Sequence, residues 1–199
     1  MSVVATEDSV LLTLDFSPLK MTDEEFYEFC RRNQDFRFEM DKEENLIIMP
    51  PTFLETSRKN AKINVRLGRW AEKDNTGVAF ESDGMFTLPN GAKRSPDAFW
   101  ILNEKYYALS KEEREERFAR IVPDFVIELR SKSDNLRKLQ SKMSEYIENG
   151  VRLGWLIDPY ERRVHVYRAD ESVEILENPQ KVSGEAVLPG FELDLTEIW

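Results

Sequence analysis

Two carboxylic acids stand where the sequence predicts buried strands. Asp97 follows Pro96 directly and opens the apolar run 98–101, while Glu128 interrupts the otherwise apolar run Phe125–Leu129. A nearly continuous apolar run of this length is typical of a strand buried on both faces. Because an unpaired buried carboxylate is costly, Glu128 requires a cation, a lysine or a hydrogen-bond network around it. Glu128 is therefore a candidate site residue.

A lysine follows in the next amphipathic segment. Residues 134–149 predict a helix whose apolar stripe has three- and four-residue spacing. Its members are Leu136, Leu139, Met143, Tyr146 and Ile147. Lys142 lies at the edge of this stripe, so its stem can pack while its ammonium group reaches the end of the neighbouring strand.

These three residue types suit phosphodiester hydrolysis. Carboxylates on adjacent strands provide the oxygen ligands that Mg²⁺ or Mn²⁺ prefers. Such an ion lowers the pKa of its bound water and orients it for attack on a phosphodiester. A lysine beside it can stabilise the charge that develops or position the water. Asp97, Glu128 and Lys142 are the candidate catalytic residues, and the two acids are the candidate metal ligands.

The same pattern has a structural interpretation. A proline followed by aspartate at a strand entry is also typical of a capped turn. Asp124 lies four residues before Glu128 and is a reserve acid. Glu55 opens the helix predicted at 55–73, where the helix dipole favours an acid, although an acid there could also face a metal.

Basic residues gather on the helix predicted at 55–73. The set comprises Arg58, Lys59, Lys62, Arg66 and Arg69. A solvated outer face is the usual role of such residues on an amphipathic helix. Contact with nucleic-acid phosphates is the alternative interpretation.

The remaining periodicity completes an α/β (α+β) pattern. The predicted elements are a helix at 21–32 with a Thr22–Glu25 capping box, a hairpin of strands 36–40 and 46–49, strands at 78–80 and 85–88, a polar helix-prone connection at 103–117, and strands at 151–157 and 164–167. We expect a mixed central sheet flanked by helices. Residues 1–35 form an N-terminal extension with a helix, packed on a single domain at 36–199, which opens with the hairpin.

Composition narrows the class of function. With 38 acids against 28 bases, the formal charge of −10 argues against a protein that coats nucleic acid nonspecifically, although a local basic cleft remains compatible with it. One cysteine and one histidine exclude an internal disulfide and most histidine-based chemistry. We expect a cytoplasmic protein, because no secretory leader or membrane-spanning run is evident.

Five segments carry a resemblance to a known family: IIMPPT at 47–52, ETSRKN at 55–60, FTLPNGAKRSPDAFWI at 86–101, VPDFVIELRSKSD at 122–134 and LQSKMSEYIENGVRLGWLIDP at 139–159. Together with the order of elements, they resemble the restriction-endonuclease-like core with its PD-(D/E)xK motif. More closely, they resemble the Uma family of proposed endonucleases, a domain of unknown function. The resemblance covers most of the chain from residue 36 onward.

The resemblance implies a metal-dependent nuclease that cuts DNA. Asp97 matches the first acid of the motif and Glu128 the second. Arg130 occupies the lysine position of the motif, but an arginine does not give up its proton, so a general-base role there is not expected. In this family a lysine of the next helix is thought to take the role, and Lys142 is the matching residue. Gln140 on the same helix is a further candidate.

Three functions remain open from the sequence. The first is a DNA endonuclease that uses Mg²⁺ or Mn²⁺. The second is a catalytically weak or inactive module of the same fold that binds nucleic acid or protein partners. The third is a structural domain in which Arg or Lys partners satisfy both acids. A homodimer is also expected, because many proteins of this fold cut two strands with two sites.

Overall fold

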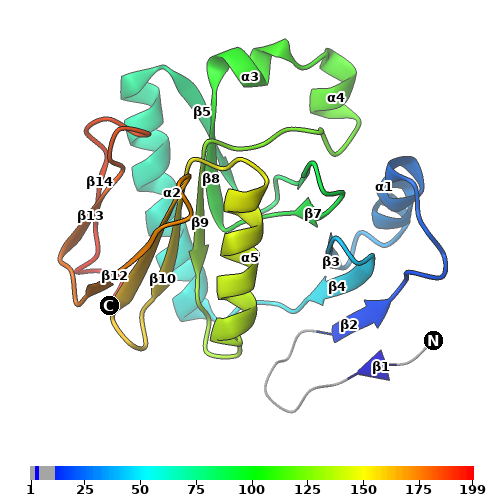
Figure 1. Cartoon of the computed structure of the whole chain (residues 1–199), viewed down its shortest axis with the longest axis horizontal. Coiled ribbons are helices and arrows are strands. Elements are labelled where there is room, and N and C mark those ends of the chain that lie inside the picture. Colours follow the sequence, from blue (N-terminus) through cyan, green and yellow to red (C-terminus); the bar gives the residue numbers. More distant parts are fainter. Residues whose placement is uncertain (1–2, 5–11) are drawn as a thin grey trace.

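The computed structural model describes residues 3–4 and 12–199, which form two six-stranded sheets and a two-stranded one (Figure 1). One six-stranded sheet, called the central sheet, has the order β12-β11-β10-β9-β8-β5. Its strands are β5 Gly77–Glu81, β8 Ala98–Leu102, β9 Phe125–Leu129, β10 Leu153–Asp158, β11 Arg163–Arg168 and β12 Val173–Glu177. β9 runs parallel to β10 and antiparallel to β8, so the sheet is mixed, as the sequence predicted.

Two helices cover the two faces of the central sheet. They are α2 Leu54–Asp74 and α5 Leu136–Glu148. Phe125, Ile127 and Leu129 of β9 belong to the core that includes α2, whereas Val126 packs in the core that includes α5. Because side chains alternate along a strand, Glu128 lies on the α5 face. All five residues of β9 are buried, which confirms the prediction of a strand covered on both faces.

The second six-stranded sheet, called the N-terminal sheet, has the order β1-β2-β4-β3-β7-β6. Its strands are β1 Val3–Val4, β2 Leu12–Asp15, β3 Arg37–Met40, β4 Asn45–Met49, β6 Phe86–Thr87 and β7 Lys93–Arg94. Helix α1, Asp23–Arg32, begins with the predicted capping box and packs through the buried Phe26 against Phe38 and Leu46. β3 and β4 form the predicted hairpin.

The C-terminal segment closes the α2 face. β13 Lys181–Ser183 pairs with β14 Glu192–Asp194, and the Phe191 ring stacks on Trp155 at 5.7 Å between ring centroids. The helix-prone connection at 103–117 contains α3 Asn103–Ala108 and α4 Lys111–Glu115. Within residues 3–4 and 12–199, no helix combines the length and the apolar character that crossing a bilayer requires.

Two strands that are close in sequence belong to different sheets. The strands expected at 78–80 and 85–88 correspond to β5 in the central sheet and β6 in the N-terminal sheet. β6 pairs with β7, and β7 pairs with β3. The domain boundary near residue 35 stays a prediction, and β2, which precedes it, pairs with β4, which follows it.

Candidate active site

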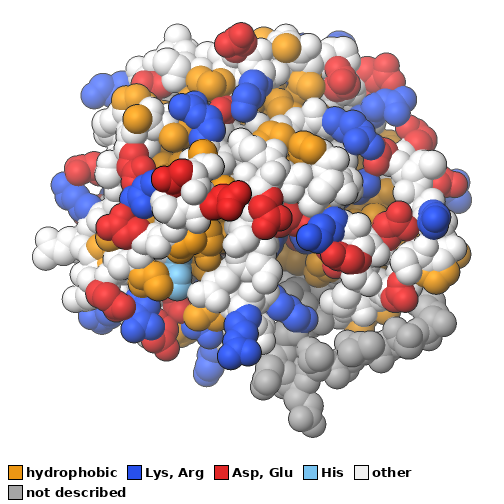
Figure 2. Space-filling model, viewed as in Figure 1, with side chains coloured by type: hydrophobic (Ala, Val, Ile, Leu, Met, Phe, Trp, Pro, Cys, Tyr) orange, Lys and Arg blue, Asp and Glu red, His pale blue; other side chains and the backbone are white. Residues whose placement is uncertain are grey.

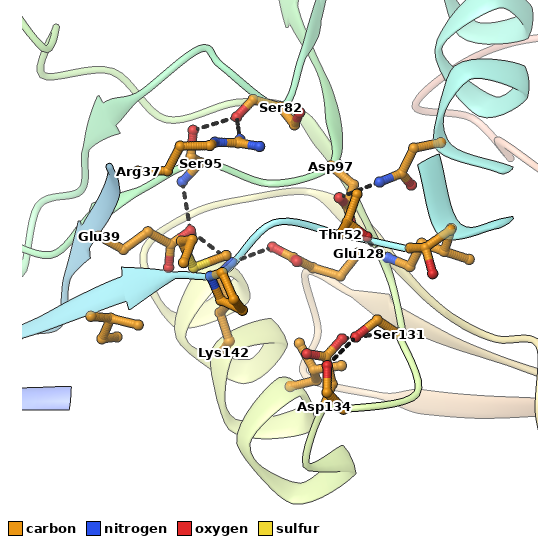
Figure 3. A pocket seen from close by; sticks show the side chains of 18 of the residues that line it. Arg37, Glu39, Thr52, Ser82, Ser95, Asp97, Glu128, Ser131, Asp134 and Lys142 are labelled. Carbon is orange, nitrogen blue, oxygen red and sulfur yellow. Dashed lines mark hydrogen bonds and ion pairs between the residues drawn. The ribbon is translucent and has the colours of Figure 1, made fainter. Parts of the chain in front are cut away.

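Asp97, Glu128 and Lys142 line one cavity of about 650 Å³. Its walls come from the β3–β4 hairpin, the start of α2, the ends of β8 and β9, and α5 (Figure 3). The antiparallel register pairs Ala98 with Ile127, so one further step places Asp97 level with Glu128. The structure therefore brings together the three residues that the sequence selected as catalytic candidates.

Asp97 is held by donors from two directions. Its Oδ1 accepts a hydrogen bond from Asn60 Nδ2 of α2 at 2.7 Å, and its Oδ2 accepts one from the Leu129 N–H at 2.8 Å. Burial raises the pKa of Asp97, while the Leu129 N–H and the charge of Lys142 oppose that rise. The carboxylate is thus fixed in orientation at the cavity wall.

Glu128 lies deeper, with 5% of the residue exposed. Its Oε1 lies 2.7 Å from Lys142 Nζ and accepts a hydrogen bond from Tyr146 Oη at 3.0 Å. Burial raises the pKa of Glu128 to about 7; Lys142 opposes the shift, and the charges of Asp97 and Glu39 add to it. Its protonation therefore changes near neutral pH.

Lys142 bridges two carboxylates. Its Nζ lies 2.7 Å from Glu128 Oε1 and 2.9 Å from Glu39 Oε1, and the side chain is 11% exposed. Burial lowers the pKa of Lys142, but the two carboxylates outweigh burial and raise it above its ordinary value. Lys142 is consequently a permanent cation at neutral pH.

Glu39 and Arg94 extend this network behind the cavity. Arg94 Nη1 lies 3.1 Å from Glu39 Oε2, and its Nε donates to Glu145 Oε2 at 2.7 Å. The charges of Glu39 and Glu145 raise the pKa of Arg94 against the effect of burial. Arg94 and Glu145 therefore balance each other, and Glu39 faces Lys142.

The side chains around the cavity carry a net negative charge that suits a divalent cation. Glu39, Asp97, Glu128 and Glu145 carry four negative charges against the two positive charges of Lys142 and Arg94, so two negative charges remain when all four acids are ionised. Asn60 Oδ1 is also buried without a hydrogen-bond partner among the described residues. These oxygens fit a hard cation of the Mg²⁺ type. Within residues 3–4 and 12–199, no group of three or more His, Cys, Asp or Glu side chains is arranged as a metal cage.

The other candidate residues lie apart from this cavity. Asp124 precedes β9 at its opposite end, where it accepts from Lys105 Nζ at 2.9 Å and from the Leu102 N–H at 3.0 Å. Arg130 points to Asp158, with Nη1 2.7 Å from its Oδ2. Gln140 is absent from the cavity lining.

The basic set on α2 also lies outside the cavity lining. Arg58 pairs with Glu55 at the start of the helix. Lys62 and Arg66 lie 2.5 Å and 2.7 Å from the two oxygens of Glu197, and neither they nor Lys59 borders the cavity. Acids of this chain thus occupy most of the predicted phosphate-binding set.

Sequence reasoning missed Glu39, Arg94 and Tyr146 as partners of the site. Glu39 alternates with Phe38 and Met40 in a predicted strand, a pattern that also fits an acid on the solvent face of a hairpin. Arg94 stands in the short polar stretch directly before Pro96 and Asp97, and its burial depends on α5 lying against β7 through Glu145.

A mixed sheet with a helix on each face is the arrangement of a restriction-endonuclease-like fold. On it, one acid precedes a strand, a second acid lies within the antiparallel neighbour, and a lysine follows on the next helix. The model of the Uma2 family, described as "Putative restriction endonuclease", matches residues 23–196. The chain therefore belongs to this family, as the sequence predicted.

A solved structure supports the fold assignment. The crystal structure of a putative nuclease belonging to DUF820 from Anabaena variabilis ATCC 29413 superposes with a TM-score of 0.71 at 20% identity. The match covers 89% of this chain and 97% of that chain. No curated protein matches the chain.

Proposed function

We propose that this protein is a metal-dependent endonuclease that hydrolyses phosphodiester bonds of DNA. Its membership of the Uma2 family supports the reaction class. The observation that carries the proposal is the buried Glu128 beside Lys142 and Asp97, with an excess of negative charge in a cavity open to substrate. The expected ion is Mg²⁺ or Mn²⁺.

Asp97 and Glu128 would hold the ion, with Asn60 Oδ1 as an adjacent oxygen donor. A bound divalent ion supplies a water of lowered pKa and neutralises charge on the phosphate. The Asn60 and Leu129 donors fix Asp97, and Tyr146 fixes Glu128, so both acids are oriented before substrate arrives. Such preorganisation avoids reorientation during the reaction.

Lys142 acts in this proposal as a fixed positive charge. Its pKa is raised above the ordinary value, so it cannot serve as a general base at neutral pH. An ammonium group has three N–H donors, and Glu39 and Glu128 engage two of them. The third is available to a phosphate oxygen or to the attacking water, where it stabilises developing negative charge.

The test compares plasmid cleavage with ion binding. Wild-type protein is incubated with supercoiled plasmid in Mg²⁺ or Mn²⁺, and Mn²⁺ affinity is measured by calorimetry. We expect nicking by the wild type, and loss of both nicking and Mn²⁺ binding in Asp97→Asn and Glu128→Gln. Glu55→Gln is the matched control, because Glu55 is an exposed acid outside the cavity lining.

Two results would contradict the proposal. Mn²⁺ binding that is unchanged in the double variant Asp97→Asn with Glu128→Gln would remove the metal site. Mn²⁺ binding without cleavage of double-stranded DNA, single-stranded DNA or RNA would favour the non-catalytic binding module. The homodimer expected from the fold is measured separately by sedimentation velocity.

A further inference from the structure

We propose that Glu39 is a positioning residue: from the N-terminal sheet it holds the Lys142 ammonium group at the cavity and thereby sets the rate of the chemical step. This inference rests on the proposed nuclease function and deepens it. It adds to the two acids and the lysine a residue from an element outside the central sheet.

Glu39 is held rigidly on its own side. It lies in the middle of β3, whose backbone pairs with β4, and only 2% of the residue is exposed. Its Oε1 accepts from the Ser95 N–H at 3.0 Å, and its Oε2 lies 3.1 Å from Arg94 Nη1. The carboxylate that meets Lys142 is therefore fixed before Lys142 contacts it.

Lys142 needs such a partner. A lysine side chain has a flexible four-carbon stem and loses much conformational freedom when its ammonium group is fixed. Glu128 alone would let Nζ rotate around one carboxylate oxygen. The second contact, at 2.9 Å from Glu39, comes from a different sheet and confines Nζ between two walls of the cavity (Figure 3).

Glu145 shows that the contact with Lys142 is specific to Glu39. Both acids are buried and both bind Arg94. Of these two acids, Glu39 contacts Lys142, whereas no contact between Glu145 and Lys142 is found among the described residues. The two acids share a structural role and differ in their contact with the site. Glu145→Gln is thus a matched control for Glu39→Gln.

The first experiment measures single-turnover cleavage in Mn²⁺. We expect Glu39→Gln to lower the rate constant about tenfold or more, because a misplaced charged group loses transition-state stabilisation. KM should stay within about threefold, since the substrate contacts are retained, and the rate is measured at saturating Mn²⁺ because Glu39→Gln also removes one negative charge near the ion. Glu145→Gln should keep the wild-type rate. An equal loss of rate in both variants would overturn the proposal.

A double-mutant cycle separates positioning from general support of the fold. If Glu39 acts through Lys142, Glu39→Gln should lower the rate no further in a Lys142→Gln background. Independent, multiplicative losses would overturn the proposal. Glu39→Asp, which keeps the charge on a shorter stem, should recover part of the rate lost in Glu39→Gln.

The position of Lys142 can also be measured without catalysis, through the chemical accessibility of its amine. Reductive methylation followed by mass spectrometry reports the access of reagent to each lysine. Lys142 should react slowly in the wild type and in Glu145→Gln, and several-fold faster in Glu39→Ala. If Lys142 stays equally protected in Glu39→Ala, Glu39 does not position it. If only cleavage is absent, the proposed function fails while the positioning role stands.

Discussion

Glu128 shows how burial changes the acidity of a carboxylate. Its side chain lies inside a strand with both faces covered, so desolvation opposes ionisation. Lys142 partly offsets this effect, and the neighbouring acids add to it. The resulting pKa of about 7 makes the proton on Glu128 sensitive to an arriving cation.

Mn²⁺ affinity should therefore depend on pH. A carboxylate must be ionised to bind a metal ion, and the pKa of Glu128 is raised from its ordinary value to about 7. The affinity should rise about tenfold per pH unit below 7 and become constant above about pH 7.5. Calorimetry in buffers of different ionisation enthalpy should detect release of a proton at pH 6. A flat affinity from pH 5.5 to 8 would contradict the assignment of Glu128 as a ligand.

Without metal, the free energy of unfolding should fall as pH rises, which is opposite to the trend in Mn²⁺ affinity. Because the pKa of Glu128 is higher in the folded than in the unfolded chain, the folded state binds more protons between about pH 4.5 and 7. The contribution of this group to stability is complete below pH 4.5 and is lost as pH rises to 7. Urea unfolding at several pH values gives the free energy of unfolding of wild type and Glu128→Gln. Between pH 4.5 and 7 this free energy should fall less steeply with pH in the variant than in the wild type.

The sequence predicted Glu128 but not Glu39, for a physical reason. The run around Glu128 is apolar on both sides, which marks burial locally. Burial of Glu39 depends on β7, through Arg94 and Ser95, and on α5, through Lys142, residues that lie 55 to 103 positions away in the chain. Such long-range pairing leaves no local signal that distinguishes it from an acid on the outer face of a hairpin.

At the scale of elements, Arg94 joins the N-terminal sheet to α5. It extends from β7 and pairs with Glu39 of β3 and Glu145 of α5, and all three side chains are buried. Removal of one member of a buried ionic group leaves uncompensated charge. These contacts thus join the N-terminal sheet to α5 behind the cavity, in addition to the packing of each core.

Arg94→Ala should consequently destabilise the protein by about 3 to 5 kcal/mol. The reason is that Glu39 and Glu145 would lose their shared partner while staying buried. Chemical denaturation gives the measurement, and Arg163→Ala is the control, since Arg163 pairs with Glu177 at the surface and should contribute less than about 1 kcal/mol. If Arg94→Ala and Arg163→Ala lowered the free energy of unfolding by similar amounts, burial of the Arg94 ion pairs would not increase their contribution to stability.

Two glycines offer a second comparison between elements. A Cβ at Gly77 of β5 would overlap the Ile101 carbonyl oxygen and the Trp100 ring, whereas a Cβ at Gly68 within α2 meets nothing within 4 Å. Gly77→Ala should destabilise by about 2 kcal/mol through overpacking. Gly68→Ala should stabilise by about 0.5 to 1 kcal/mol, because alanine favours a helix. Thermal unfolding of both variants tests the opposite signs.

Elements themselves were more predictable than their assignment to sheets. The periodicities of α2, α5 and β9 are local, and each element forms near the predicted residues. The pairing of β6 and β7 with β3 depends on side chains far apart in the sequence. No periodicity within residues 85–94 indicates which sheet they join.

At the scale of the whole molecule, acidic and basic side chains are interspersed on the face that Figure 2 shows. The formal charge of −10 disfavours nonspecific attraction to nucleic acid. The basic set on α2 is partly neutralised by Glu197 near the C-terminus, which engages Lys62 and Arg66. Charge at this surface is thus limited by an acid of the same chain.

Removal of that acid should strengthen DNA binding. Glu197→Gln frees Lys62 and Arg66 for phosphate contacts, so affinity for a short duplex should rise about two- to fivefold at low salt. Fluorescence anisotropy across a salt series checks this result. Glu177→Gln on β12 makes the same change in net charge beside Arg163 of β11. Equal gains in both variants would assign the effect to net charge alone.

The path of the chain between the two sheets has a consequence for unfolding. β6 and β7 belong to the N-terminal sheet, yet they lie in sequence between β5 and β8 of the central sheet. The chain therefore leaves the central sheet and returns to it, so neither sheet can be assembled from one continuous segment. Melting followed by tryptophan fluorescence and by far-UV circular dichroism should give one shared transition, and limited proteolysis should release no stable fragment that contains only one of the sheets.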